Sequence, residues 1–241
     1  MKNMIAMLII STVSYASLDS DYNETCISHP ATVVKSYDFS ESGWRSGFAD
    51  FPSGQEAFFE LQSRAGTTYQ DKDGNQHTGF MLSGINHSDD LFMFVKLPVS
   101  SDGLTEYTTY YAQFSVEFAS NVASEGCAGI GGAPNGVTVK TGLTVEEPVA
   151  SGSYMRLNID KGNQIQGGKD VLVLGDIGSD SIDTCGCSPY AIVTRNSKEQ
   201  LFSVTTDENK RLWLMLGFDS GFEGKTTLYL NKIKVVLTAV E

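Results

Sequence analysis

The chain has 241 residues, of which 41% are hydrophobic, and its formal net charge at neutral pH is −12. A surface with this excess of carboxylates repels phosphate backbones and anionic lipid heads, so we expect no nucleic-acid partner. The same surface is compatible with bound cations or with neutral sugars. The length suffices for one substantial β domain or two small ones, and no linker divides it.

The first 16 residues have the pattern of a short secretory signal peptide. Lys2 precedes an apolar stretch, and the small residues Ser14 and Ala16 fit a cleavage after Ala16. This stretch is shorter than the roughly 20 residues that span a bilayer, and no later stretch qualifies, so we expect no membrane span. The sequence predicts a secreted or periplasmic protein whose residues 17–241 form a single β-sandwich domain.

Apolar residues recur at every second position along most of the chain. Between residues 108 and 118, the even positions from 110 onward are apolar or aromatic and alternate with mostly polar residues, as in a half-buried antiparallel strand. Similar strands are expected at 32–39, 56–62, 78–84, 91–95, 137–142, 154–159, 171–175, 191–195, 201–205, 211–218 and 228–240. Turn residues separate them, including a hairpin turn at 72–75. This pattern predicts an all-β fold, a two-sheet antiparallel β-sandwich of the jelly-roll kind.

Two of these strands carry further information. Residues 91–95, Leu-Phe-Met-Phe-Val, are apolar on both faces, which is typical of a central strand that is covered on each side. In the last strand the inward parity changes between Leu230 and Ile233, so we expect a β-bulge near Asn231 and Lys232.

The four cysteines are Cys26, Cys127, Cys185 and Cys187. An even number behind a signal peptide favours disulfides over metal thiolates. Because only one residue separates Cys185 from Cys187, a bond between these two would be strained, so each is expected to pair with Cys26 or Cys127.

Five polar residues, 86–90, stand directly before the central strand. Asp89 and Asp90, with Asp176 from a later loop, offer the oxygen ligands that a structural Ca²⁺ would use. The alternative is that these residues form turn hydrogen bonds and remain solvated. Asn86-His87-Ser88 also matches an N-glycosylation acceptor, as does the segment starting at Asn23.

A ligand site would form if the loops at one end of the sandwich converge. Asn86 and His87 would then join Asp160, Lys161 and Asn163 of a later loop. Sugars also stack on exposed aromatic rings. Trp44 lies in a loop-like context and is the first candidate for such a platform, and further candidates on solvent faces are Tyr69, Tyr107, Tyr111 and Tyr154.

No catalytic residue is assigned from the sequence. The chain has three histidines, and neither a nucleophile elbow nor a recognisable triad is present. The segments "NHSDDLFMFVKL", "GGAPNGVTVKTG" and "NIDKGNQ" resemble a group of uncharacterised secreted or lipid-anchored bacterial proteins. "VTVKTG" and Gln76-His77 are also similar to segments of jelly-roll alginate lyases, although the strand lacks the tyrosine of that motif.

The favoured function is a secreted, non-catalytic binding protein for carbohydrate with a structural calcium. The first alternative is a polysaccharide lyase that uses His77 or His87 as base and a tyrosine as acid. The second is a structural or adhesive surface protein. The oligomeric state, the ligand and the disulfide pairing are left open.

Overall fold

A computed structural model describes residues 31–240, apart from residues 88, 187–188 and 198–199. The predicted signal peptide, Asn23, Cys26, Ser88 and Cys187 lie outside the described residues. Within the described residues the regular structure consists of β-strands, and none of these residues forms a helix long and apolar enough to cross a membrane.

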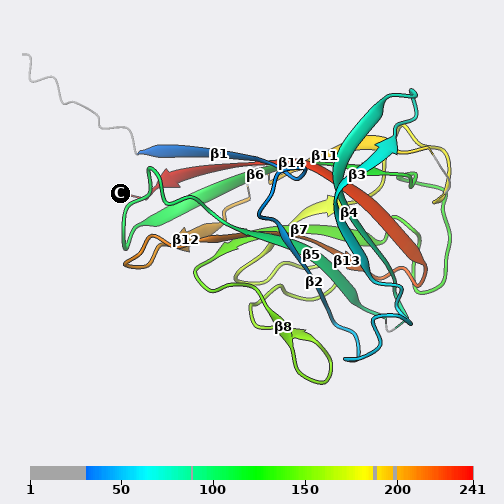
Figure 1. Ribbon diagram of the computed structural model, residues 1–241, viewed down its shortest axis with the longest axis horizontal. Helices are drawn as coiled ribbons and strands as arrows, with labels where there is room; N and C mark the ends of the chain where they lie inside the picture. The colour runs from blue at the N-terminus through cyan, green and yellow to red at the C-terminus, as the bar shows by residue number, and fades with distance from the viewer. Residues whose placement is uncertain (1–30, 88, 187–188, 198–199, 241) are drawn as a thin grey trace, which may run out of the picture.

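Two antiparallel sheets face each other, with sheet A along the top and sheet B below it in Figure 1. Sheet A contains β1 (Thr32–Asp38), β3 (Gln62–Gln70), β4 (Gln76–Ile85), β6 (Thr109–Ser120), β11 (Ala191–Asn196), β12 (Ser203–Thr205) and β14 (Lys225–Ala239). Sheet B contains β2 (Arg45–Ala49), β5 (Leu91–Pro98), β7 (Val137–Thr144), β10 (Leu172–Asp176) and β13 (Trp213–Ser220). A separate small ribbon pairs β8 (Ala150–Ser151) with β9 (Arg156–Leu157).

The strand order confirms the predicted jelly roll. Sheet A runs β11-β6-β14-β4 and sheet B runs β10-β7-β13-β5 at their centres. The chain passes from β4 to β5, from β6 to β7, and from β13 to β14, crossing between the sheets each time, so the two sheets are interleaved as two Greek keys. The strands β3 and β2 extend the edges of sheets A and B, β1 pairs with β14 beyond the end of β4, and β12 continues the line of β11 along β6.

The core lies between the sheets and follows from the alternation in the sequence. Phe114, Val116 and Phe118 of β6 point inward against residues of sheet B, among them Val139 and Phe218. Their odd-numbered neighbours on β6 point outward. The predicted central strand is confirmed, because β5 lies between β13 and β2 and its first six residues are buried.

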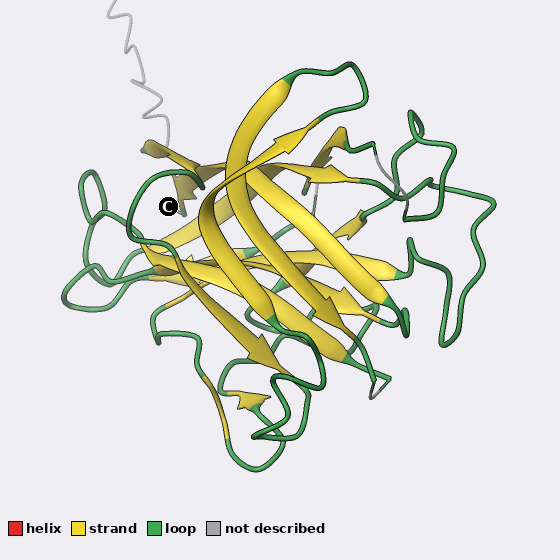
Figure 2. Ribbon diagram, turned by 45° about the vertical axis from the view of Figure 1, so that its right-hand side comes forward, coloured by secondary structure: helices red, strands yellow, loops and turns green. Residues whose placement is uncertain are grey.

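A long segment, residues 145–171, covers the outer face of sheet B and makes that face a second, smaller core. Ile159 and Val171 of this segment pack against Phe92, Phe94 and Met215, which point outward from the sheet. Figure 2 shows this segment with its small β8–β9 ribbon below the two layers. We call residues 145–171 the covering segment. The outer face of sheet A has no such cover among the described residues, and several of its side chains are exposed.

Local features match the sequence in most places. The register of β14 shifts between Leu230 and Lys232, which confirms the predicted bulge. The hairpin turn at 72–75 joins β3 to β4, with Gly74 at a φ of 84°. Residues 56–62 were expected as a strand, but most of them form turns, and the strand follows at 62–70.

A disulfide joins Cys127 to Cys185, with the two sulfurs 2.04 Å apart. It links the glycine-rich loop after β6 to the loop before β11, as expected for a cysteine at 185 that bonds to a distant partner. A covalent link of this kind stabilises a surface loop that has few apolar contacts.

The exposed platform predicted at Trp44 is wrong. Its side chain is only 9% exposed and belongs to the main core. The indole lies 4.2 Å from the ring of Phe39, and its Nε1 donates a hydrogen bond to the carbonyl of Asp38 at 3.1 Å. The loop context suggested exposure, but the following strand β2 pairs with β5 and draws the ring inward.

Candidate functional site

The polar corner at residues 86–90 is a structural junction. Asn86 is fully buried, and its Nδ2 donates a hydrogen bond of 2.7 Å to the carbonyl of Ser220 at the end of β13. This contact ties the β4–β5 turn to sheet B. Because the side chain is buried, Asn86 is not a glycosylation acceptor in the folded protein.

His87 lies at the surface beside aromatic rings. Its imidazole stacks on Phe58 with a centroid distance of 4.3 Å and meets the edge of Phe59 at 5.5 Å. Phe58 is 61% exposed, so the pair forms a small aromatic patch on the turn before β5. The structure does not show His87 in contact with Asp160, Lys161 or Asn163.

Two of the three predicted loops do converge, and their charges meet at Lys161. The Nζ atom of this residue lies 2.8 Å from Asp219, 3.0 Å from Asp50 and 3.7 Å from Asp90. Lys161 belongs to the covering segment, whereas the three aspartates belong to sheet B or to the ends of its strands. The segment is therefore held to the sheet by buried ion pairs.

Lys140 of β7 adds a second attachment from the sheet side. Its Nζ lies 2.8 Å from Asp219 and donates hydrogen bonds to the backbone carbonyls of Lys161, Asn163 and Gln166. Lys140 and Asp219 are both completely buried. A buried charge is tolerated only when it is paired and hydrogen-bonded, and both conditions hold here.

Burial and the neighbouring charges set the protonation states of Asp90 and Asp219 in this cluster. Burial, together with the hydrogen bond and the negative charge of Asp219, raises the pKa of Asp90 to about 8. Burial alone would raise the pKa of Asp219 too, but the hydrogen bond from Asp90 and the two lysines outweigh it and lower that pKa. A protonated Asp90 can therefore donate a hydrogen bond to an ionised Asp219.

The remaining predicted ligand residues are used by the covering segment itself. The carboxylate of Asp160 accepts hydrogen bonds from the backbone N–H groups of Gly162 at 3.0 Å and Lys169 at 2.9 Å. Asn163 Oδ1 accepts from the N–H groups of residues 165 and 166. These side chains shape the loop, as Asx turns do.

The three aspartates predicted to bind calcium do not form one site. Asp90 faces Lys161 and Asp219, whereas Asp176 lies 3.3 Å from Arg195 and accepts a hydrogen bond from the N–H of Gly178. Over the described ranges, no group of three or more His, Cys, Asp or Glu side chains is arranged to hold a metal ion. Calcium binding as such stays a prediction.

The alternative with His77 as a catalytic base receives little geometric support. His77 Nε2 lies 2.8 Å from Asp71, and the imidazole stacks on Tyr69 with a centroid distance of 5.2 Å. The Tyr69 hydroxyl is directed to Asn231 Oδ1 at 2.9 Å, and burial raises its pKa to about 12. Tyr69 is 6% exposed, so a polymer substrate cannot reach it without rearrangement.

A cavity of about 670 Å³ opens elsewhere, at the side of the sandwich. We call it the lateral pocket. Its walls are the end of β7 with the following residues, two parts of the covering segment, and the strand β12 with the residues before it. The lining residues are Leu143, Thr144, Val145, Glu146, Asn158, Ile159, Lys169, Asp170, Leu201, Phe202, Ser203, Val204 and Thr205.

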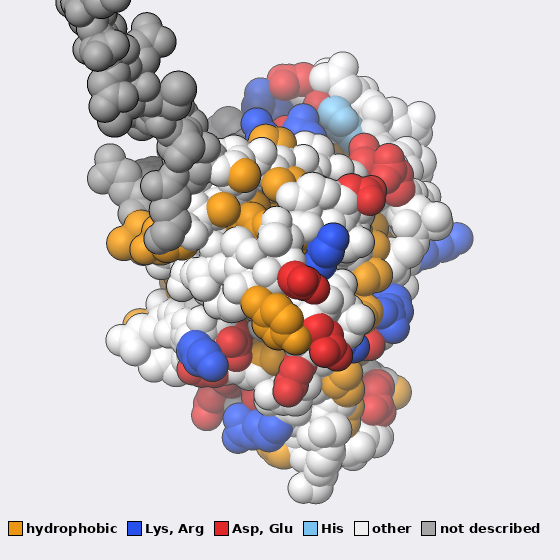
Figure 3. All heavy atoms as spheres, turned by 90° about the vertical axis from the view of Figure 1, so that its left-hand side faces the viewer, with side chains coloured by type: hydrophobic (Ala, Val, Ile, Leu, Met, Phe, Trp, Pro, Cys, Tyr) orange, Lys and Arg blue, Asp and Glu red, His pale blue; other side chains and the backbone are white. Residues whose placement is uncertain are grey.

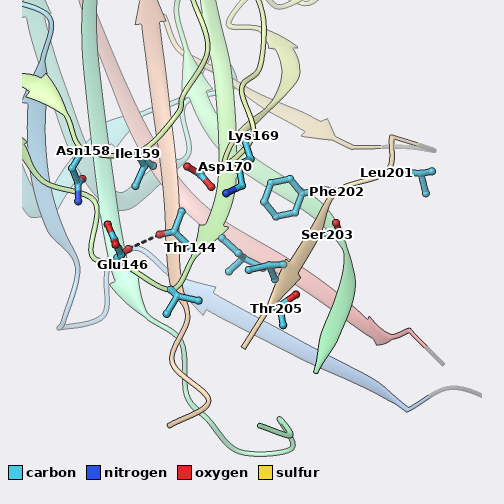
Figure 4. A pocket seen from close by; sticks show the side chains of 13 residues that line it. Thr144, Glu146, Asn158, Ile159, Lys169, Asp170, Leu201, Phe202, Ser203 and Thr205 are labelled. Carbon is cyan, nitrogen blue, oxygen red and sulfur yellow. Dashed lines mark hydrogen bonds between the residues drawn. The ribbon is translucent and has the colours of Figure 1, made fainter. Parts of the chain in front are cut away.

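Charged and aromatic groups meet inside the lateral pocket. Figure 4 shows the side chains of Lys169 and Asp170 between Ile159 and the ring of Phe202. Asp170 Oδ2 accepts a hydrogen bond from the N–H of Asp160 at 2.9 Å, which orients the carboxylate. Leu201 lies at the rim and is 85% exposed.

Several polar groups of the lateral pocket are available to a ligand. The Lys169 ammonium, the Glu146 carboxylate and the Ser203 hydroxyl make no hydrogen bond or ion pair within the described part of the chain. Thr144 and Asn158, in contrast, bond to nearby backbone groups. The sequence did not predict this pocket, because no motif marks the four separate stretches of chain that line it.

Charged side chains of both signs lie at one end of the sandwich. Figure 3 views the end of the sandwich where β1 begins and β14 ends, and acidic, basic and apolar side chains are interspersed there. The full chain carries a formal net charge of −12 at neutral pH.

No family model matches the chain, and no curated protein matches it either. Among solved structures it is similar to the CBM22-1 xylan-binding domain of Xyn10C from Paenibacillus barcinonensis, with 12% identity, a TM-score of 0.38, and coverage of 89% of this chain and 100% of that one. It is also similar to TmCBM27, a carbohydrate-binding module described for mannan recognition, with 13% identity, a TM-score of 0.35, and coverage of 85% and 97%.

A third similar structure is the K1 cleaved adhesin domain of Lys-gingipain from Porphyromonas gingivalis, with 10% identity, a TM-score of 0.29, and coverage of 84% and 97%. At such low identities and TM-scores, these likenesses carry no argument about a ligand. The fold assignment rests on the strand order of the two sheets.

Proposed function

We propose that this chain is a secreted or periplasmic, non-catalytic protein that binds carbohydrate in the lateral pocket. The observation that carries the proposal is the pocket itself, with an ammonium, carboxylates and hydroxyls placed beside apolar side chains. Its volume of about 670 Å³ lies within the range of small-molecule sites, roughly 300–1,000 Å³.

The pocket chemistry suits an uncharged sugar. Sugar hydroxyls both donate and accept, so Lys169 can donate to one hydroxyl while Asp170 or Glu146 accepts from another. Leu201, which is 85% exposed at the rim, offers apolar surface to the C–H face of a pyranose, whereas Phe202 and Ile159 are buried in the pocket wall. Two carboxylates against one ammonium give the described lining a net negative charge, which disfavours acidic sugars.

The disulfide between Cys127 and Cys185 supports the export part of the proposal. Structural disulfides form in oxidising compartments such as the periplasm and the extracellular space. Together with the signal-peptide pattern of residues 1–16, this bond favours a location outside the cytoplasm.

A glycan array followed by isothermal titration calorimetry tests the proposal. We expect a neutral oligosaccharide to bind, and we expect Lys169→Ala to weaken that binding on the order of tenfold, the loss of about one charge-assisted hydrogen bond. Lys169 is the best residue to change because its ammonium makes no hydrogen bond or ion pair in the described chain and interacts with Asp160 only through its charge, so its loss should disturb the fold little. Asp73→Ala, at the exposed β3–β4 turn, is the matched control.

Three outcomes would contradict the proposal. One is the same sugar affinity in wild type and Lys169→Ala, which would move the site elsewhere. The second is a silent array together with concentration-dependent self-association in sedimentation experiments, which would favour the adhesive alternative. The third is the release of unsaturated ends from acidic polysaccharides, which would favour the lyase alternative.

A further inference from the structure

A second hollow lies on the outer face of sheet A. It has a volume of about 250 Å³ and lies over β6, β14 and the end of β11. Its polar lining includes Gln113 and Ser115 of β6, Asn196 of β11 and Lys234 of β14. We call it the sheet groove. None of these residues lines the lateral pocket.

The sheet groove presents polar groups that the protein does not use. The side chains of Gln113, Ser115 and Lys234 make no hydrogen bond or ion pair within the described residues. The neighbouring Lys232 differs, because its Nζ lies 3.0 Å from Glu117. An amide, a hydroxyl and an ammonium are therefore free to bind a ligand.

An exposed aromatic ring lies next to the groove on the same strand. Tyr111 is 46% exposed and precedes Gln113 by two residues, so both point to the outer face of sheet A. The amphipathic pattern of β6 does not need this ring for the core, because the core side chains are those at even positions.

Tyr111 also connects the groove to the lateral pocket. In the pairing of β6 with β12, Tyr111 is the partner of Ser203, and Ser203 lines the pocket. Ser115, at the far end of the groove, is the partner of Lys234 on β14. From Tyr111 to Ser115 the strand rises about 13 Å, so a ligand that covers both ends must be extended.

We propose that the sheet groove and Tyr111 are a second binding site that continues the lateral pocket, and that the ligand is a linear chain of neutral sugars long enough to occupy both. This inference rests on the proposed function. One end of the chain occupies the pocket, the middle passes over β12 and stacks on Tyr111, and the other end bonds to Gln113 and Lys234.

The position of the groove favours a sugar chain over a peptide. An extended peptide that adds to a sheet bonds to the free backbone groups of an edge strand. The groove lies on the face of the sheet, where β6 and β14 already pair with each other, so recognition depends on side chains. An amide and a hydroxyl beside an exposed ring match the hydroxyls and the apolar face of a pyranose.

Titration calorimetry with neutral β-linked gluco-, xylo- and manno-oligosaccharides, from disaccharide to hexasaccharide, tests this inference. In wild type we expect affinity to increase on the order of tenfold or more from the shortest to the longest member of the series that binds. In the double variant Tyr111→Ala and Gln113→Ala this gain should disappear, while disaccharide affinity stays as in wild type. Ile192→Ala, an exposed change elsewhere on the same sheet face, is the control.

The outcomes separate the two proposals. If a disaccharide binds but the gain with length is absent in wild type, or is unchanged in the double variant, the second site is wrong and the lateral pocket stands. If no member of the three series binds at any length, both proposals are wrong. Both substitutions are on the solvent side of β6, and a thermal melt will show whether each variant is folded.

Discussion

The two outer faces of the sandwich contrast in what covers them. On sheet B, every residue of β7 is buried between the main core and the covering segment, and the charged pair Lys140 and Asp219 has no exposed surface. On sheet A, residues of the same kind, such as Gln113 and Lys234, face solvent. The comparison shows that a lysine on a strand becomes structural when loop carbonyls surround it, and stays available for binding when they do not.

Replacing one lysine on each face should give the largest difference in stability between the two faces. Lys140→Met removes a buried cation that serves Asp219 and three carbonyl groups, so we expect the free energy of unfolding to fall by about 4 kcal/mol. Lys234→Met on the open face should change it by less than about 0.5 kcal/mol. Urea unfolding of both variants measures the difference, and equal effects would refute the contrast between the faces.

Apolar truncation gives a second, somewhat smaller test. Met215 is buried between sheet B and the covering segment, so Met215→Ala should cost about 3 kcal/mol through lost burial and a cavity. Val236 lines the sheet groove on the open face, and Val236→Ala should cost well under 1 kcal/mol. If Met215→Ala proved as mild as Val236→Ala, the covering segment would not be packed against sheet B in solution.

The pH dependence of stability sharpens the comparison further. Because the pKa of Asp90 is raised from 3.8 to about 8 in the folded protein, its stabilising contribution is full below pH 3.8 and is lost as pH rises through the window up to about 8. Asp90→Asn keeps an uncharged hydrogen-bonding group there. The stability of this variant relative to wild type should therefore rise with pH across that window.

Asp207 is a control, because its pKa is shifted in the opposite direction from that of Asp90. Hydrogen bonds from the backbone and side chain of Arg211 lower the pKa of Asp207, so its contribution is present above its ordinary pKa and is lost as pH falls. Asp207→Asn should thus lose stability relative to wild type as pH rises through that range. Denaturant melts of both variants at several pH values measure these slopes, and parallel slopes would contradict the assignment for Asp90.

Chelation should have the smallest effect. At the corner of sheet B, Lys140 and Lys161 already supply positive charge to the aspartates, so we expect EDTA to leave the thermal midpoint unchanged. A lower midpoint that added Ca²⁺ restores would establish the cation predicted from the sequence. Such a result would also require ligands other than the trio Asp89, Asp90 and Asp176.

The alternation of apolar and polar residues, together with the turn residues, was enough to predict the jelly roll. In each half-buried strand the inward-facing positions are apolar, so the buried face can be identified from the sequence. These patterns failed for β2 and β3. Most residues of β3 are exposed, so this edge strand lacks an apolar period, and its place is fixed by hydrogen bonds to β4. The sequence pattern indicates which side chains are buried. An exposed edge strand is instead held by backbone hydrogen bonds, which leave no such pattern.

The site was less predictable than the fold. The predicted ligand site required the loops at 86–90 and 158–164 to converge, and Lys161 does lie 3.7 Å from Asp90. What the sequence could not show is that Lys161 would be enclosed by three carboxylates and so be structural. The lateral pocket was missed because Glu146, Lys169 and Ser203 come from three distant segments that carry no shared motif.

The long strand β14 has a consequence for biosynthesis. The ribosome makes β14 after β1, β4 and β6, and β14 pairs with all three of these earlier strands. Before residues 225–239 emerge, these three strands carry unpaired backbone edges that can recruit other chains. A nascent chain that lacks residues 225–239 is therefore prone to aggregate, and the synthesis of these residues must precede the completion of sheet A.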